Sequence, residues 1–145
     1  MKRLSICWII GCLLGLVACR PEVPAQAEQG ETDVFPDYRE VTVPVNMAPP
    51  NFKLVDQQLQ GIIRLKTMNG ELIIAADHGA FNLPETDWKV LSQDAQGKQI
   101  DVTVYFREPQ SDWKQMSFPI YVSRDSVDAY LVYRRIFPGY RMWNE

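Results

Sequence analysis

The sequence predicts a mostly β domain, built as an antiparallel sandwich with one short helix and a partly helical C-terminal tail. Apolar and polar residues alternate with a period of two over long stretches, which is typical of half-buried strands. Short apolar runs are separated by turn residues about every 8 to 12 positions, and helical signals occur in one internal segment. About six or seven such strands favour an immunoglobulin- or fibronectin-like sandwich, with an α+β fold as the alternative.

The first 18 residues predict an export signal that is cleaved after Ala18. Lys2 and Arg3 supply its positive start, and the apolar run that follows, about 13 residues, is shorter than the roughly 20 that span a bilayer. The run ends in LVAC, whose cysteine is Cys19. This tetrapeptide resembles the lipobox of bacterial lipoproteins, which implies a covalent lipid on Cys19 and the loss of residues 1–18. An uncleaved signal anchor with an incidental cysteine is the alternative.

Acyl chains such as palmitate on Cys19 would hold the mature protein on a membrane, because each buried methylene contributes about 0.8 kcal/mol. No cysteine follows Cys19, so neither a disulfide nor a thiolate metal site is expected in the mature chain. Arg20 stands where an aspartate retains some Gram-negative lipoproteins at the inner membrane. We therefore expect an outer-membrane lipoprotein of the cell envelope that faces the periplasm.

Residues 19–33 are predicted to form a lipidated flexible tether. Residues 20–33 read RPEVPAQAEQGETD, with prolines, a glycine, several charges and almost nothing to bury. Such a composition does not offset the entropy that is lost when a chain becomes ordered. We expect a coil with an average span of roughly 20 Å.

The folded domain is expected over residues 34–123, and its strongest strand signal lies at 100–106. The apolar residues of that strand are Ile100, Val102, Val104 and Phe106, and they alternate with Asp101, Thr103 and Tyr105. Alternation resumes over 116–122 after a polar turn, which predicts a hairpin. Pro119 lacks an amide donor, so the second strand is expected at an edge or to contain a bulge.

A second hairpin is predicted around Asn69-Gly70, because this dipeptide favours a type I′ turn. Residues 84 to about 95 are predicted to form the helix, since Pro84 suits a first turn and Gly97 suits an end. The helix would cross between two sheets. The other expected strands are 61–66 and 71–75 beside the second hairpin turn, and shorter ones near 41–45 and 52–54.

The composition argues against several classes of function. The formal net charge is −3, and an acidic protein repels phosphate backbones, so no nucleic-acid partner is expected. His78, the only histidine, has no recognisable orienting partner and cannot build a zinc site without cysteines. No phosphate-binding glycine loop and no Gly-x-Ser-x-Gly motif occurs. We expect no enzyme, no metal ion and no cofactor besides the covalent lipid on Cys19.

Residues 124–145 are an aromatic C-terminal tail that needs a surface to pack against, either its own sandwich or a partner. The residues expected to contact a protein partner are Tyr130, Tyr133, Arg134, Tyr140 and Trp143. An alternative function is glycan binding in the cell envelope, by stacking sugar rings on exposed tryptophans among Trp88, Trp113 and Trp143. Core and rim positions in the sandwich are the favoured interpretation of those rings, because aromatic side chains commonly dominate core burial.

Several segments resemble the N-terminal β domain of TolB-like envelope lipoproteins of Gram-negative bacteria, in which a small β domain precedes a β-propeller. The resembling segments are Phe35-Pro36-Asp37-Tyr38, residues 41–52 (VTVPVNMAPPNF), Trp88, residues 102–105 (VTVY), and residues 128–134 (DAYLVYR) with Pro138-Gly139-Tyr140. The resemblance implies a lipid-anchored accessory domain rather than a catalyst.

The chain also departs from that family. It stops about where the propeller would begin, and it lacks the Cys-x-x-Cys-His haem motif of some members. Ala129 and Arg135 stand where a proline and an aliphatic residue are expected. A stand-alone form and a truncated or split product both fit these departures. The resulting hypothesis is a membrane-anchored lipoprotein whose non-catalytic sandwich mediates protein–protein contact through its tail.

Overall fold

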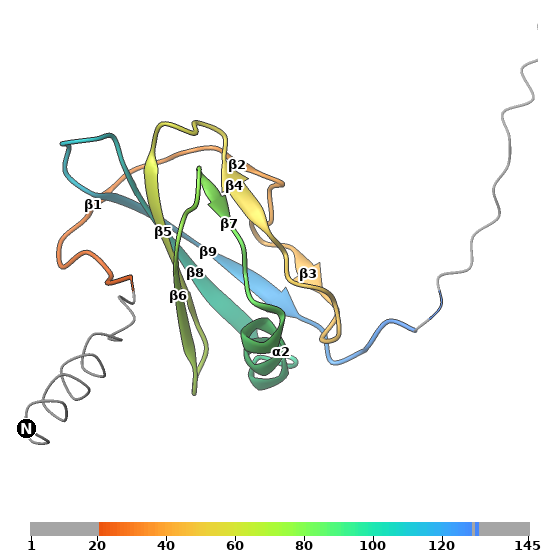
Figure 1. Cartoon of the computed structure of the whole chain (residues 1–145). Helices are drawn as coiled ribbons and strands as arrows, with labels where there is room; N and C mark the ends of the chain where they lie inside the picture. The colour runs from red at the N-terminus through yellow and green to blue at the C-terminus, as the bar shows by residue number, and fades with distance from the viewer. Residues whose placement is uncertain (1–20, 129, 131–145) are drawn as a thin grey trace, which may run out of the picture.

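The computed structural model describes residues 21–128 and residue 130. These residues form two β-sheets and one short helix (Figure 1). The elements in chain order are β1 (Glu28–Gln29), β2 (Val34–Phe35), β3 (Thr42–Val43), β4 (Phe52–Leu54), β5 (Gln60–Lys66), β6 (Glu71–Ala75), β7 (Ala80–Phe81), α2 (Glu85–Asp94), β8 (Gln99–Arg107) and β9 (Lys114–Val122).

The main sheet has the strand order β1-β9-β8-β5-β6, and β3 also pairs with β9. Its long strands β5, β6, β8 and β9 pair antiparallel. The short strands β1 and β3 run parallel to β9 and pair with its two ends, with Glu28 opposite Lys114 and Thr42 opposite Tyr121. The prediction of a wholly antiparallel fold is wrong for these two strands, because each reaches β9 from a distant part of the chain rather than through a hairpin.

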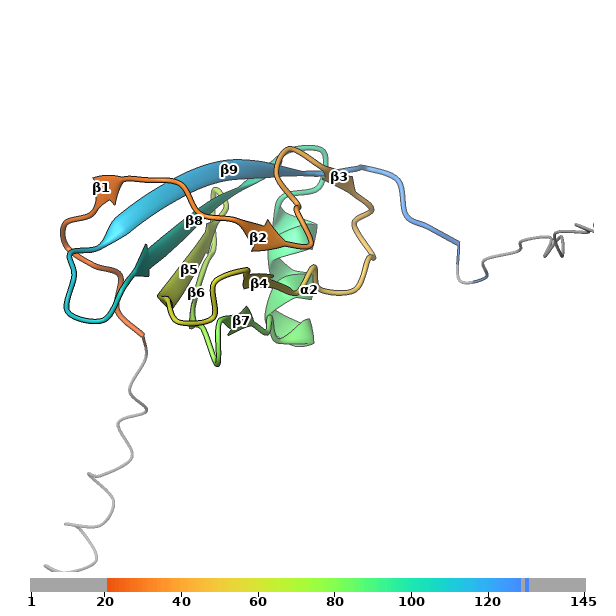
Figure 2. The same ribbon diagram turned by 90° about the horizontal axis from the view of Figure 1, so that it is seen from above.

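The second layer consists of the antiparallel sheet β2-β4-β7 and α2, which lie on the same side of the main sheet (Figure 2). The core lies between this layer and the main sheet. Its fully buried side chains come from both layers: Leu54, Phe81 and Trp88 from the second layer, and Ile63, Ile100, Val102, Val104 and Ile120 from the main sheet. Alternate residues of each long strand therefore face inward, as the period of two predicts.

The structure confirms a mostly β domain with two sheets and a single short helix among the residues that it describes. The immunoglobulin- or fibronectin-like assignment stays a prediction. The expected partly helical tail lies outside the described residues, apart from its first few positions.

Gly61 marks the closest approach of the two layers. A Cβ atom placed there would lie 2.9 Å from both Leu54 Cδ1 and Phe81 Cζ, which is closer than carbon atoms normally pack. The missing side chain lets β5 lie directly against β4 and β7. This contact holds the small sheet onto the main sheet at one end of the core.

The hairpin formed by β8 and β9 is confirmed, with eight residue pairs running from Gln99–Tyr121 to Phe106–Lys114. Pro119 lies in β9 between the short segments that pair with β1 and β3. Its carbonyl accepts a bond of 3.0 Å from the amide of Glu40, on the side away from β8. A residue's N and C=O point to the same side of a strand, so the missing donor of Pro119 faces the outer edge, as predicted.

The hairpin formed by β5 and β6 is also confirmed, but its predicted type I′ turn is wrong. Neither Asn69 nor Gly70 has a positive φ angle. The Thr67 amide donates to the Gly70 carbonyl at 2.9 Å, and the Gly70 amide donates to the Thr67 hydroxyl, also at 2.9 Å. The hydroxyl thus replaces the backbone acceptor of an ordinary two-residue hairpin, and the backbone avoids the left-handed region.

The helix α2 spans the predicted segment within one residue at each end. Pro84 precedes it with extended backbone, and Gly97 follows it at a φ of 72°, where a side chain would be strained. It connects β7 of the small sheet to β8 of the main sheet. The predicted crossover between sheets is confirmed.

The predicted flexible tether is wrong for its second half. The amide of Glu28 donates to the Trp113 carbonyl at 2.9 Å, and the amide of Gly30 donates to the Gln115 carbonyl at 3.0 Å. Composition predicted a coil because the segment has little to bury, but its backbone groups pair with the free edge of β9 instead. The chain therefore first joins the main sheet at Glu28.

Replacing Gly61 with alanine should lower the free energy of unfolding by about 1–3 kcal/mol, because the new methyl group overlaps Leu54 and Phe81. Urea denaturation followed by circular dichroism measures the change. Lys66→Ala, on the exposed end of the same strand, is the matched control and should stay within about 0.5 kcal/mol of the parent. Equal stability of the two variants would contradict the tight contact.

Candidate functional site

Most of the residues singled out in the sequence lie outside the described part of the chain. These are Cys19, the cleavage site at Ala18, and Tyr133, Arg134, Tyr140 and Trp143 of the tail. Tyr130 is described, and 85% of its side chain is exposed. The structure therefore describes the start of the tail. The contacts that the tail is expected to make with a protein partner stay a prediction.

Asn46 holds the start of the tail against the domain. Its side-chain amide donates to the Val127 carbonyl at 2.7 Å and accepts from the Val127 amide at 2.8 Å. The neighbouring carbonyl, that of Met47, accepts a bond of 2.9 Å from the indole of Trp88 in α2. The tail therefore departs from the end of the domain where β3 and α2 lie (Figure 1).

The tryptophans considered for sugar stacking differ in their surroundings. Trp88 is buried in the core, so neither face of its ring is open. Trp113 is partly buried, and the guanidinium of Arg107 lies 4.3 Å from the centre of its ring, within cation–π range. Trp143 lies outside the described residues.

His78 lies in an exposed turn, as predicted, with a positive φ of 48°. The carboxylate of the neighbouring Asp77 lies 3.6 Å from its Nε2 atom. Within residues 21–128, no three His, Cys, Asp or Glu side chains are grouped so that they could hold a metal ion. The same residues contain no helix that is long and apolar enough to cross a bilayer.

Residues 21–27 cross the outer face of the main sheet, opposite α2 and the small sheet (Figures 1 and 2). Pro21 lies beside Ile73 of β6, whereas Glu28 pairs with β9, so this segment passes over β5 and β8. Thr103 and Tyr105 lie on the outer face of β8 along this path, and both are buried. We call residues 21–27 the strap.

The strand β6 is a free edge of the main sheet. Among the described residues it pairs with β5 alone, and the Ala76 amide donates to the Gly61 carbonyl at 2.8 Å. Backbone groups of an antiparallel strand alternate between its two sides, so those of Glu71, Ile73 and Ala75 point away from β5. No hydrogen bond to these groups is present within the described part of the chain. Such a row of unpaired donors and acceptors is a template for another strand.

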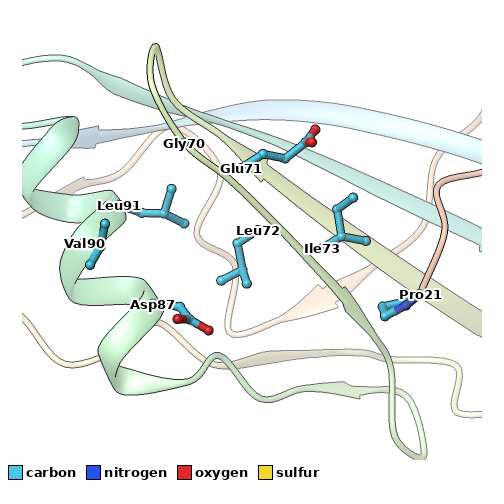
Figure 3. Close-up of a pocket in the computed structure, with 8 residues that line it drawn as sticks. All are labelled: Pro21, Gly70, Glu71, Leu72, Ile73, Asp87, Val90 and Leu91. Carbon is cyan, nitrogen blue, oxygen red and sulfur yellow. The ribbon is translucent and has the colours of Figure 1, made fainter. Parts of the chain in front are cut away.

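A trough of about 530 Å³ runs along this edge, with α2 on one side and Pro21 on the other (Figure 3). We call it the β6 trough, and its lining residues are Pro21, Gly70, Glu71, Leu72, Ile73, Asp87, Val90 and Leu91. Val90 is 66% exposed, which is unusual for a valine on a helix that packs against a core. The trough thus combines unpaired backbone with an apolar wall.

Two carboxylates stand at the rim of the β6 trough, on opposite faces of the main sheet. Asp87 belongs to α2 and lies on the core side. Glu71 projects to the outer face, where its carboxylate lies 3.8 Å from Arg64 Nε. That Arg64 nitrogen is buried and has no hydrogen-bond partner among residues 21–128, and the guanidinium lies 6.0 Å from the centre of the Tyr105 ring.

One end of the trough lies where the turn after β5 meets the end of α2. Asp94 accepts hydrogen bonds from the amide and the side chain of Asn69. The Thr67 hydroxyl, followed by the Asn69 side chain, holds the pKa of Asp94 below the ordinary value of an aspartate. Since Gly70 lines the trough, this contact fixes one end of it.

The sequence alone did not identify this site. The run Leu72-Ile73-Ile74 predicts a strand, but it does not reveal which of its edges stays unpaired. That property follows from the strand order, which depends on long-range pairing. One signal was present: three consecutive apolar residues instead of alternation indicate a strand with apolar surface on both faces.

Comparison with known proteins adds no relative. No protein-family model matches the chain, no curated protein matches it, and no solved structure matches it.

The lowered pKa of Asp94 predicts a pH-dependent contribution to stability. A carboxylate whose pKa is depressed by folding stabilises the fold above its unfolded pKa and loses this effect as the pH falls through the folded value. Melting temperatures measured between about pH 7 and pH 3 should therefore fall more steeply for the parent than for Asp94→Asn. Parallel curves would rule out this contribution. Asp56→Asn, at an exposed carboxylate elsewhere, serves as the control.

Proposed function

We propose that the protein is a cell-envelope lipoprotein, anchored through acyl chains on Cys19, whose β domain mediates contact with other proteins and is not a catalyst. The single observation that carries this proposal is the β6 trough. Unpaired backbone groups of Glu71, Ile73 and Ala75 lie beside an exposed apolar wall, which is the arrangement used when an extended peptide adds a strand to a sheet.

The strap determines where a lipid on Cys19 would lie relative to the domain. A fully extended chain advances at most about 3.6 Å per residue, so the Cα atoms of Cys19 and Pro21 are within roughly 7 Å of each other. Pro21 lines the β6 trough. A lipid on Cys19 would therefore place the trough next to the membrane surface, and no long flexible linker would separate the two.

The remaining parts of the proposal rest on the sequence. Residues LVAC at 16–19 suit lipidation, and Arg20 suits transfer to the outer membrane with the domain in the periplasm. The resemblance to the β domain of TolB-like lipoproteins also favours an accessory role, and an immunoglobulin-like classification belongs to the same proposal. In that role the domain would present a surface to a partner.

Replacing Cys19 with serine should move the protein from the membrane fraction to the soluble envelope fraction, because the thiol that carries the lipid is lost. Fractionation followed by immunoblotting reads the location, and incorporation of labelled palmitate reads the modification. Cys12→Ser changes a cysteine inside the predicted signal and should alter neither. Membrane association of the Cys19 variant would overturn the lipoprotein assignment.

Val90→Asp should reduce the recovery of partner proteins from envelope extracts at least about fivefold, because it places a charge on the apolar wall of the trough. Quantitative mass spectrometry of captured proteins measures this change. Val55→Asp is the matched control, since Val55 is also an exposed valine, 56% exposed, but does not line the trough. Equal recovery with both variants would mean that the trough is not the contact surface.

A further inference from the structure

Among the described residues the strand β6 is an open sheet edge, and the sequence continues beyond them into an aromatic, basic tail. We propose that residues 130–137 of a second copy of this chain bind along β6 as an added strand. This inference rests on the proposed contact function and names its partner. The β6 trough of one copy would bind the tail of another. When two copies exchange tails, they form a closed dimer.

The backbone of β6 is suited to this addition. Glu71, Ile73 and Ala75 each direct one N–H and one C=O away from β5, over the whole length of this five-residue strand. An added strand of about five residues would pair all of these groups. Neighbouring strands lie about 4.8 Å apart, so the added strand would lie between the wall of α2 and Pro21.

The sequence of residues 130–137 is suited to the role of the added strand. It reads YLVYRRIF, which combines aromatic and aliphatic residues that favour strands. Successive side chains of a strand point to opposite faces, so the adjacent Arg134 and Arg135 would project one to each face. The trough has one carboxylate on each face, Asp87 on the α2 side and Glu71 on the outer side. Either direction of the strand therefore brings each arginine to the face that holds an acid.

The overall charge distribution supports the same pairing. Residues 21–130 contain nine basic and seventeen acidic residues, a formal charge of −8. Residues 131–145 contain three arginines and one glutamate, a formal charge of +2. Opposite charge on the two binding elements favours their encounter and fixes their register.

The point of departure of the tail favours a second copy over the same molecule. Asn46, shortly after β3, fixes Val127, and both views place the chain that follows β9 on the far side of the fold from β6. To reach its own β6, the tail would cross the solvent face of α2, where Thr86, Lys89 and Gln93 are exposed. That path offers little apolar surface to Leu131 and Val132. Copies anchored on one membrane, in contrast, meet at a raised effective concentration.

Native mass spectrometry of the full lipidated chain in detergent micelles tests the inference, because it counts chains directly. We expect a dimer for the parent. Ile73→Pro and Ala75→Pro each remove an outward-facing amide without touching the pairing with β5, and each should weaken dimerisation at least about tenfold. Arg134→Glu with Arg135→Glu should do the same from the tail side. Circular dichroism confirms that each variant is folded.

A mixing experiment separates tail exchange from other modes. A chain that ends after Asp128 keeps the whole buried core and the Asn46–Val127 contact but lacks the added strand. It should be monomeric alone, and it should form a mixed dimer with Ile73→Pro, since one supplies the edge and the other the tail. A dimer of the shortened chain alone would indicate pairing of two β6 edges and overturn the inference.

A monomeric parent at concentrations up to about 100 µM would also overturn it. The contact function would survive that result if recovery of other envelope proteins still depended on Val90 and not on Val55. The experiments therefore distinguish a failure of the proposed dimer from a failure of the proposed contact function.

Discussion

The fold depends on covering one face of the main sheet with a small sheet and one short helix. Apolar burial of about 25 cal/mol per Å² is the dominant favourable term, and β8 contributes Ile100, Val102 and Val104, none of which is exposed. The covering layer is thin, and Gly61 lets it approach without a gap. Two segments lie outside this core. The strap crosses the outer face of the main sheet, and two hydrogen bonds with Asn46 hold the start of the tail.

Local patterns predicted the elements that depend on local sequence. Alternation over 100–106 and 116–122 predicted the hairpin of β8 and β9, and Pro84 and Gly97 predicted the ends of α2. The turn at Asn69-Gly70 was mispredicted because the Thr67 hydroxyl supplies an acceptor that dipeptide statistics do not contain. The strand β1 was missed because its partner lies more than eighty positions away, and no local signal marks such a pairing.

The candidate site could not be predicted from the sequence for the same reason. Individual residue types can suggest a kind of site: His78 suggests catalysis or metal binding, and Trp88 suggests sugar stacking. An open sheet edge instead belongs to the strand order and is made of backbone groups that every residue has. Only its flanking features, Val90 on α2 and the acids Glu71 and Asp87, leave a trace in the sequence. The tail residues that we propose to meet them were identified for their aromatic character.

The two edges of the main sheet are not equivalent. Along β9, the outward carbonyls of Gln115 and Pro119 accept bonds from Gly30 and Glu40, and the Tyr121 amide donates to Val41. Short segments of the same chain pair with much of that border, so β6 is the edge that the described residues leave open along its whole length. The main sheets of neighbouring copies are thereby kept from joining β9 to β6, and growth of one continuous sheet into a fibril is blocked at that border.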